Sequence, residues 1–253
     1  MQAAFQTRDD RVFALFSGLP GTSGMMEAAR HGMGRAWADS PLHPRAAVVT
    51  VGDFLYCGGE PGPSAARLLR TAVGSEKRGW LVDAPGAWKA VLDKVAPHTP
   101  QMRYAFDHGV QPEDGRLRRL LEAVPEGMTF APIEGRWISW CREQVWCRDF
   151  VSLFTDEQYA REGLGVLALL DGEPVAGAGS YVAYPGGIEV QVETRRAYQG
   201  RGLATLVAAK LILMAHAQGR IATWDAANAQ SARVAEKLGY RFAGTYTVYE
   251  VKQ

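Results

Sequence analysis

The chain has 253 residues, enough for one large or two small domains with substantial hydrophobic cores. Hydrophobic residues make up 47% of it and charged residues 22%, proportions that are ordinary for a soluble globular protein. The formal charge of +1, from 28 basic and 27 acidic residues, provides no basic footprint for nucleic acid or for a membrane surface.

Targeting and metal-binding signals are absent from the sequence. No stretch reaches the ~18 apolar residues of a membrane span, and no basic segment followed by an apolar core opens the chain. Cys57, Cys141 and Cys147 are odd in number and lack metal-ligand spacing, so we expect reduced thiols in a cytoplasmic protein. The five histidines form no pair with metal spacing, and we predict no metal site. His216, on an apolar helix, is expected to be a partly buried residue with a hydrogen-bond partner.

The first half of the chain predicts an α/β lobe with its own core. Residues 25–37 are predicted to be a helix. Strands are expected next at 46–50 and 53–57, joined through Gly52, although one longer strand with a kink would also fit. The elements expected after them are a helix capped by Ser64, a strand at 80–82, a helix carrying Trp88, Val91, Leu92 and Val95, a strand at 102–106 and a helix at 116–123. In the segment 58–64, two prolines remove N–H donors and Glu60 would repel an anion, so we interpret it as a structural turn.

Turn-rich segments at 108–115 and 125–127 indicate a junction, and we place a domain boundary after residue 125. The predicted domains are therefore 1–125 and 126–253. The elements expected in the second domain are a strand at 128–133, helices at 136–154 and 156–161, strands at 164–170 and 174–184 joined by an Asp171-Gly172 hairpin turn, and a strand that begins at Ile188.

The most informative segment is Gln199-Gly200-Arg201-Gly202-Leu203-Ala204. It lies between the strand 188–193, which alternates apolar with charged or polar residues, and the apolar segment 203–216, which contains no Gly or Pro. A glycine turn that opens such a helix presents free backbone N–H groups and the positive end of the helix dipole, and these bind phosphate. A missing Cβ lets the backbone approach the anion. We therefore predict a site for a phosphorylated ligand.

Two other phosphate motifs do not fit this segment. A dinucleotide fingerprint would need a third small residue at Thr205 and a longer succession of strands and helices. A nucleotide P-loop would need Gly-Lys-Ser/Thr, which does not occur near this segment. A nucleotide-binding oxidoreductase is therefore disfavoured.

A second motif, Asn228-Ala229-Gln230-Ser231, opens a short helix that Gly239-Tyr240 closes. With both motifs, residues 128–253 resemble the GNAT acetyltransferase superfamily. The residues that match its phosphate motif are Gln199, Gly202 and Ala204, and those that match its second motif are Asn228, Ser231, Gly239 and Tyr240. Segments 188–194 and 224–228 further resemble the branch that includes the zwittermicin A resistance acetyltransferase, most members of which have no assigned substrate.

This resemblance implies an α/β (α+β) fold. Residues 126–253 would form a GNAT domain with a mixed, mostly antiparallel sheet flanked by helices, and residues 1–125 a divergent, GNAT-like half that shapes the acceptor pocket. The implied activity is an acetyl-CoA-dependent N-acetyltransferase, in which the amine of a small-molecule acceptor, antibiotic or amino-acid-like, attacks the thioester directly. No nucleic-acid or membrane partner is expected.

The same resemblance implies where acetyl-CoA lies. Its pyrophosphate would bind the N–H groups of 200–205, its pantetheine arm would pair with the strand ending at 192–194, and Asn228 would bond a pantetheine amide. The implied cofactor contacts are Val192, Glu193, Thr194, Gln199, Gly200, Arg201, Gly202, Leu203, Ala204, Thr205, Asn228 and Ser231.

Such a reaction needs a base for the ammonium and an acid for the departing thiolate. Glu189 and Asp225 are equal candidates for the base because both are expected near the acetyl group, although each could equally be a solvated or capping residue. Glu193 ranks behind them, since its backbone is expected to serve the cofactor. The acid is usually a Tyr seven residues after the motif Asn, where this chain has Ala235. Tyr246 or Tyr249 would substitute, or else water would protonate the thiolate.

The missing Tyr supports a second hypothesis, a non-catalytic acyl-CoA-binding or ligand-sequestering protein. Both proteins would bind CoA, but only an enzyme would consume acetyl-CoA when an acceptor is present. Trp137, Trp140 and Trp146, on the predicted 136–154 helix, fit two interpretations: an aromatic wall for the acceptor, or ordinary core packing at helical spacing.

Overall fold

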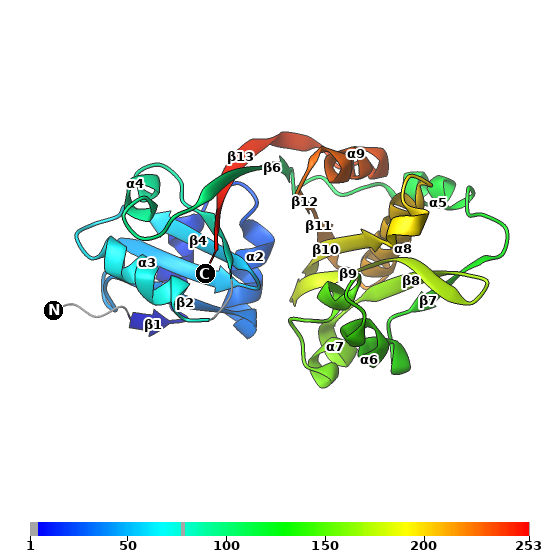
Figure 1. Cartoon of the computed structure of the whole chain (residues 1–253), viewed down its shortest axis with the longest axis horizontal. Coiled ribbons are helices and arrows are strands. Elements are labelled where there is room, and N and C mark those ends of the chain that lie inside the picture. Colours follow the sequence, from blue (N-terminus) through cyan, green and yellow to red (C-terminus); the bar gives the residue numbers. More distant parts are fainter. Residues whose placement is uncertain (1–4, 77–78, 253) are drawn as a thin grey trace. The chain divides into compact units, whose positions relative to one another are not determined.

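The chain folds into two units in the computed structural model, which describes residues 5–76 and 79–252. The first unit contains Met1–Arg103 and Thr245–Gln253, and the second contains Tyr104–Gly244 (Figure 1). The structure groups residues 104–125 with the second unit and residues 245–252 with the first, so the domain boundary predicted after residue 125 stays a prediction. The assignment of a GNAT domain to 126–253 stays a prediction.

The first unit is built on the strands β1-β2-β3-β4-β5-β13 of an eight-stranded sheet, whose order continues with β6 and β12. Neighbouring strands are antiparallel except β4 and β5, which are parallel and are joined through α3. Its elements are β1 (Phe5–Thr7), α1 (Asp10–Phe13), η1 (Ala14–Phe16), α2 (Ser23–Ala28), η2 (Ala29–Met33), β2 (Gly34–Ala38), β3 (Ala46–Val51), β4 (Phe54–Gly59), α3 (Ala65–Val73), β5 (Trp80–Asp83), α4 (Trp88–Leu92) and the end of β13 (Phe242–Val251).

The predicted helix over 25–37 is wrong in its second half. The α-helix covers only Ser23–Ala28, a π-helical turn follows, and β2 begins at Gly34. Gly32 has a φ of 102°, which interrupts the helical backbone. Gly34 lies so close to β3 that a Cβ there would be 2.3 Å from the backbone oxygen of Thr50, so strand pairing overrides the helical pattern.

The second unit contains a five-stranded sheet with the order β11-β10-β9-β8-β7. It is antiparallel throughout except for the parallel pair β10 and β11, as predicted for a mixed, mostly antiparallel sheet. The elements are the end of β6 (Thr99–Phe106), which begins in the first unit, α5 (Asp114–Leu121), β7 (Met128–Pro132), α6 (Arg136–Glu143), η3 (Arg148–Phe150), α7 (Asp156–Glu162), β8 (Gly165–Leu170), β9 (Glu173–Tyr184), β10 (Gly187–Thr194), η4 (Arg196–Tyr198), α8 (Leu203–Ala217), β11 (Ile221–Thr223), β12 (Asp225–Ala226), α9 (Ala229–Leu238) and the start of β13.

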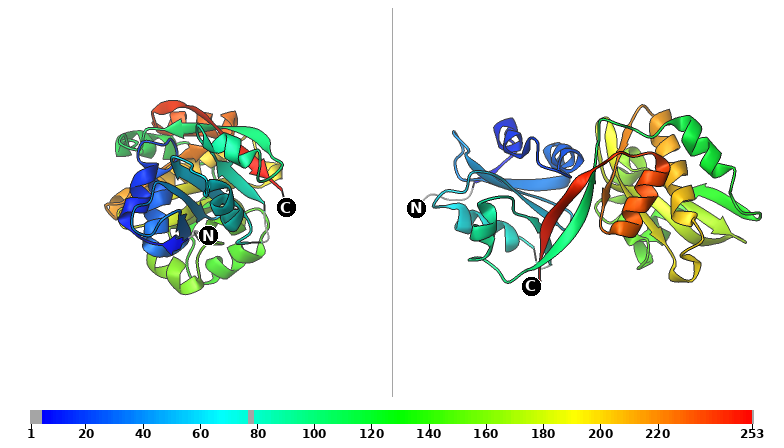
Figure 2. Two further views of the ribbon diagram at one scale, coloured as in Figure 1. Left: turned by 90° about the vertical axis from the view of Figure 1, so that its left-hand side faces the viewer. Right: turned by 90° about the horizontal axis from the view of Figure 1, so that it is seen from above.

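Helices cover both faces of this sheet. The apolar helix α8 packs on β8, β9 and β10, and α9 lies beside it (Figure 2). On the other face η3 packs on β9 and β10, and Phe150 lies against Gly177 and Gly179. The helix predicted over 136–154 is therefore wrong as one element, because α6 ends at Glu143 and Gln144 is extended (φ −94°, ψ 120°).

The two units repeat one order of elements. In the first unit β2, β3 and β4 form antiparallel pairs, and α3 then leads to β5, parallel to β4. In the second unit β8, β9 and β10 do the same, and α8 leads to β11, parallel to β10. The first unit therefore has the topology of a second, divergent half, as the resemblance implied.

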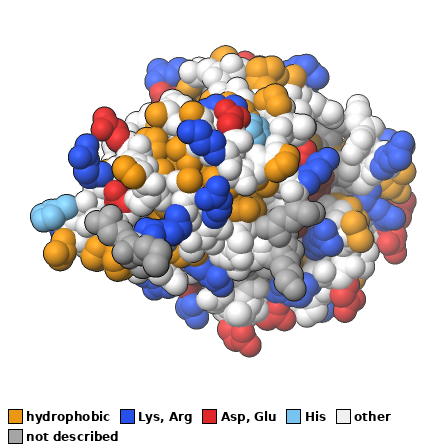
Figure 3. All heavy atoms as spheres, turned by 60° about the vertical axis from the view of Figure 1, so that its left-hand side comes forward, with side chains coloured by type: hydrophobic (Ala, Val, Ile, Leu, Met, Phe, Trp, Pro, Cys, Tyr) orange, Lys and Arg blue, Asp and Glu red, His pale blue; other side chains and the backbone are white. Residues whose placement is uncertain are grey.

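The surface mixes charges of both signs. On the face that Figure 3 shows, Lys and Arg side chains lie among Asp and Glu side chains and uncharged polar surface. Among the described residues, no helix combines the length and the apolar character needed to cross a bilayer.

Candidate active site

The edge of β10 opens toward its carboxyl end. Pairing with β11 covers only Gly187–Glu189, whereas pairing with β9 continues to Thr194. The register with β9 shifts between Glu189 and Val190, and beyond Thr223 the chain pairs with β6 instead of β10. In the described part of the chain, the edge of residues 190–194 facing β11 thus has no strand partner. An extended ligand arm could pair with it as a strand would.

The glycine turn follows directly. Gly200 and Gly202 have φ values of 78° and 79°, in the left-handed region, and a Cβ on either would meet no atom within 4 Å. Glycine is therefore needed here for the backbone conformation and not for space within the chain. In the described residues, the backbone N–H groups of 200–204 donate no hydrogen bond within the chain. These open donors stand at the amino-terminal end of the 15-residue helix α8, as an anion site requires.

Hydrogen bonds hold the glycine turn and the start of α9 in place. The Gln199 side-chain amide donates to the Thr194 backbone oxygen at 3.1 Å, tying the turn to the end of β10. Asn228 is the N-cap of α9, as predicted, and its Oδ1 accepts from the Ser231 N–H at 2.9 Å. The Trp224 indole N–H donates to Ser231 Oγ at 3.3 Å.

These elements enclose a cavity of about 350 Å³ in the second unit. It brings together eleven of the twelve predicted cofactor residues; Arg201 instead turns its guanidinium over the Tyr198 ring. The lining residues that the sequence analysis missed are Tyr198, Trp224, Gln230, Arg233, Val234 and Lys237. The four-residue spacing of Arg233 and Lys237 on the exposed side of α9 was the available signal.

One cavity-lining side chain has an unsatisfied polar atom. Thr194 Oγ1 is buried and, among the described residues, has no hydrogen-bond partner. Buried polar atoms normally have a partner, so this hydroxyl fits a polar ligand group in the cavity. Together with the open N–H groups of the turn, it makes the cavity compatible with the phosphate and amide groups of CoA.

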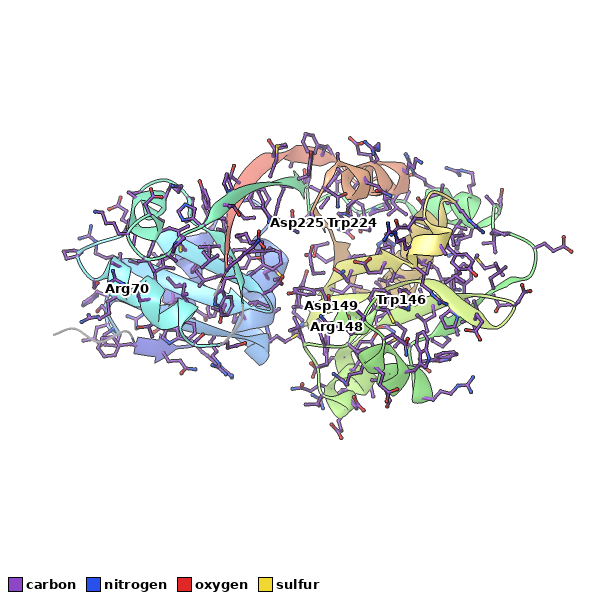
Figure 4. The ribbon with its side chains drawn as sticks, in the orientation of Figure 1. Arg70, Trp146, Arg148, Asp149, Trp224 and Asp225 are labelled. Atoms are coloured by element: carbon purple, nitrogen blue, oxygen red, sulfur yellow. The ribbon has the colours of Figure 1, made fainter. Side chains whose placement is uncertain are left out.

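Glu193 is the carboxylate that lines this cavity. Its Oε1 accepts from the Gln191 side-chain amide at 3.2 Å. Burial raises the pKa of Glu193, and the negative charge of nearby Asp149 raises that pKa further. Asp149 lies on η3, next to Arg148 (Figure 4).

The two favoured base candidates lie around the point where β10 and β11 diverge. Glu189 is buried, with 7% of its surface exposed, and its Oε2 accepts a hydrogen bond from the Thr223 hydroxyl. Asp225 is half-buried on β12, next to Trp224 (Figure 4). Neither Glu189 nor Asp225 is among the residues that line the 350 Å³ cavity.

A histidine that the sequence analysis did not single out is electrostatically coupled to Asp225. Burial lowers the pKa of His108, while the charges of Asp225 and Asp107 and a hydrogen bond with the Trp224 backbone favour its protonated form. His108 follows β6, and no local motif marks it, because β6 and β12 meet only in the folded unit.

The tyrosines predicted as acids belong to the first unit. The Tyr246 hydroxyl is adjacent to Gly21, where an added Cβ would be 2.6 Å away. Tyr249 packs against the His98 ring and beneath the Lys89 amine. Ala235, at the usual Tyr position, is fully buried. The acid role of Tyr246 stays a prediction.

The tryptophans form a chain of edge-to-face contacts. Ring centroids are 5.4 Å apart for Trp137 and Trp140, 6.3 Å for Trp140 and Trp146, and 6.2 Å for Trp146 and Phe150. All three tryptophans are half-buried, which fits both core packing and an aromatic wall, so their role toward an acceptor stays a prediction.

His216 and the three cysteines, which the sequence analysis considered, lie outside the cavity. His216 Nδ1 hydrogen bonds with Asp114 Oδ1 at 2.7 Å, which confirms its expected partnered state. The three cysteines are buried and free. No cluster of His, Cys, Asp and Glu in the described part of the chain could hold a metal ion.

This fold and site define an acetyltransferase, and the chain belongs to the GNAT acetyltransferase family, whose model matches residues 14–249. It is 31% identical to a GCN5-related N-acetyltransferase-like protein of Streptococcus suis 89/1591, whose crystal structure superposes with a TM-score of 0.85 and covers 97% of this chain and 98% of that one. It is 25% identical over 232 residues to the uncharacterised N-acetyltransferase YdfB of Bacillus subtilis strain 168, over 85% of each chain. A tandem GNAT protein from the clavulanic acid biosynthesis pathway shares the fold, with 12% identity, a TM-score of 0.56 and coverage of 99% and 97%.

Proposed function

We propose that this GNAT-family enzyme transfers an acetyl group from acetyl-CoA to the amine of a small-molecule acceptor. The observation that carries the proposal is the cavity in which the open N–H groups of 200–204 adjoin the unpaired edge of β10. One element offers phosphate contacts and the other offers pairing for an extended arm. In CoA the pyrophosphate is followed by the extended, amide-bearing pantetheine arm, so CoA matches both elements in their order along the cavity.

The residues would divide the work as follows. The N–H groups of the turn would hold the pyrophosphate, and the β10 edge with Thr194 Oγ1 would hold the amide-bearing arm. Bound acetyl-CoA supplies the thioester to be attacked. The chain orients the amine, removes its proton and provides donors near the developing charge.

Glu193 is our proposed general base. It lines the cavity, and its raised pKa makes it a stronger base than an ordinary carboxylate, which favours removal of a proton from the acceptor ammonium. Glu189 and Asp225 remain the alternatives, the first with its carboxylate already bonded to Thr223 and the second coupled to His108. Glu193→Gln should lower kcat by about 10²–10⁴-fold while CoA affinity stays nearly unchanged. Glu189→Gln and Asp225→Asn, measured in parallel, would identify the base if Glu193→Gln retains full turnover.

The acceptor is proposed to be small because the formal charge of only +1 gives no indication of a polyanionic partner. Its narrower likeness to the zwittermicin A resistance branch remains a hypothesis. Non-catalytic sequestration of acyl-CoA is the competing proposal, favoured by Ala235 at the usual acid position. Thiol release from acetyl-CoA across a panel of primary amines separates the two, since a sequestering protein would release none.

Cofactor binding is tested by calorimetric titration with acetyl-CoA. Gly202→Glu adds bulk and negative charge at the turn, and we expect it to abolish binding. Gly186→Glu is the matched control, because Gly186 has a φ of 88° and equally open surroundings but lies outside the cavity. Retained binding in Gly202→Glu, or equal loss in both variants, would contradict the proposed site.

A further inference from the structure

Two cations on α9 face the cofactor cavity. Arg233 and Lys237 are four residues apart, so they lie on one face of the helix, and both line the cavity. Both are exposed, and in the described part of the chain neither side chain forms an ion pair or a hydrogen bond. Helix packing and capping of α9 therefore do not explain why two positive charges stand here.

The charges of the cavity are unevenly distributed. Its carboxylate, Glu193, lies on β10, beside the edge proposed for the pantetheine arm. Lys237 lies nine residues beyond Asn228, which places it about 14 Å along the axis of α9 from the N-cap. Lys237 thus stands near the end of α9 remote from Asn228, the residue expected to contact the arm, and Arg233 stands one turn nearer to Asn228, at the middle of the helix.

The glycine turn accounts for only part of the charge on CoA. Its open N–H groups suit the pyrophosphate, but CoA also carries a 3′-phosphate monoester, with about −1.5 to −2 charges at pH 7. An arginine fork and a lysine ammonium are the side chains that bind such a group. An unpaired Arg and Lys on one helix face match its charge.

We propose that Arg233 and Lys237 bind the 3′-phosphate of CoA, so that this enzyme discriminates CoA from 3′-dephospho-CoA. This inference rests on the proposed use of acetyl-CoA. It assigns to α9 a second anion contact, separate from the pyrophosphate site on α8.

The test is a titration of the full chain with CoA and with 3′-dephospho-CoA at fixed ionic strength. In the wild type, CoA should bind on the order of tenfold more tightly than 3′-dephospho-CoA, since two exposed charge pairs contribute a few-fold each. In Arg233→Gln/Lys237→Gln this ratio should fall toward one, through weaker CoA binding alone. Arg119→Gln/Lys210→Gln removes the same charges from α5 and α8, outside the cavity, and should keep the wild-type ratio.

The other outcomes are equally informative. If the double variant weakens both ligands equally, the cations contact the pyrophosphate or act through the general field, and the proposal is overturned. An unchanged ratio and unchanged affinities would overturn it too. If the wild type binds neither ligand, the proposed function itself fails, whereas wild-type binding of both with equal affinity refutes only the 3′-phosphate contact.

Discussion

At the scale of single residues, the proposed base Glu193 is a carboxylate whose pKa the nearby charge of Asp149 affects. Burial raises the pKa of Glu193 more than the charge of Asp149 does, and the Gln191 amide opposes both. A base works only when deprotonated, so the acidic limb of kcat/KM should follow the pKa of Glu193. Asp149→Asn removes a negative charge that disfavours the Glu193 carboxylate. The pKa of Glu193 should then fall, and the acidic limb should move to lower pH.

The measurement is a pH–rate profile of wild type and Asp149→Asn on the same acceptor. Asp156→Asn serves as a control, because it removes a carboxylate that pairs with Arg142 and not one that shifts the pKa of Glu193. A limb that stays in place in Asp149→Asn, or moves to higher pH, would show that Glu193 does not govern the rate.

Which site residues the sequence could predict depends on how local their roles are. Gly202 and Asn228 act through backbone conformation and a cap within three residues, so a short motif reveals them. Arg233 and Lys237 are ordinary surface cations until α9 folds beside α8. His108 reaches Asp225 only because β6 and β12 pair across more than a hundred residues.

At the scale of elements, the contact of η3 with β9 holds Asp149 and Trp146 in place. An added Cβ would be 2.6 Å from the Phe150 ring at Gly177, and 2.8 Å from Phe150 Cβ at Gly179. Gly177→Ala should therefore displace Phe150, lower the free energy of unfolding by about 1–3 kcal/mol and reduce turnover. Chemical denaturation and steady-state kinetics provide the two readouts.

Gly115→Ala is the matched control for this substitution. Gly115 lies in α5, and a Cβ there makes only ordinary contact with Arg119 at 3.6 Å, so alanine should leave stability equal or improved by up to about 1 kcal/mol. Phe150→Leu replaces the opposing ring with a smaller side chain and should restore part of the stability lost in Gly177→Ala. Wild-type stability in Gly177→Ala would mean that this contact does not fix η3.

The same contact explains where sequence patterns failed for elements. Residues 136–154 contain no Gly or Pro, so nothing local ends a helix at Glu143; packing of Phe150 on the glycines of β9 accompanies the break. The strand β2 was likewise hidden, because Ala36 and Trp37 fit a helical stripe until they pair with β3. The Asp171-Gly172 turn was predictable, because a two-residue hairpin turn needs positive φ values and Asp-Gly is a preferred pair for it. Asp171 and Gly172 have φ values of 52° and 84°.

At the scale of the whole molecule, the two units share an order of elements but differ at the turn that precedes the crossover helix. In the first unit this turn is 58–64, before α3. Glu60 N–H donates to the Arg45 oxygen at 2.9 Å, and Ala65 N–H donates to the Gly62 oxygen at 3.0 Å. Pro61 and Pro63 have no N–H, and the Glu60 carboxylate faces Arg45 at 3.5 Å. In the described part of the chain, the N–H groups of Gly62 and Ser64 stay open, but Pro63 separates them, so this turn has no run of consecutive open donors like that at 200–204.

One CoA per chain should follow from this difference. Both units have the strand–turn–helix frame of an anion site, but among the described residues only the second has a run of consecutive open N–H groups with two left-handed glycines directly before its crossover helix. Calorimetric titration of the wild type with CoA should give a stoichiometry of one, and Gly202→Glu should remove all binding rather than half of it. Gly62→Glu, in the turn of the first unit where a Cβ also meets no atom within 4 Å, should leave both stoichiometry and affinity unchanged. Two equivalents of CoA, or a residual site in Gly202→Glu that Gly62→Glu abolishes, would mean that the first unit has kept a cofactor site despite its prolines.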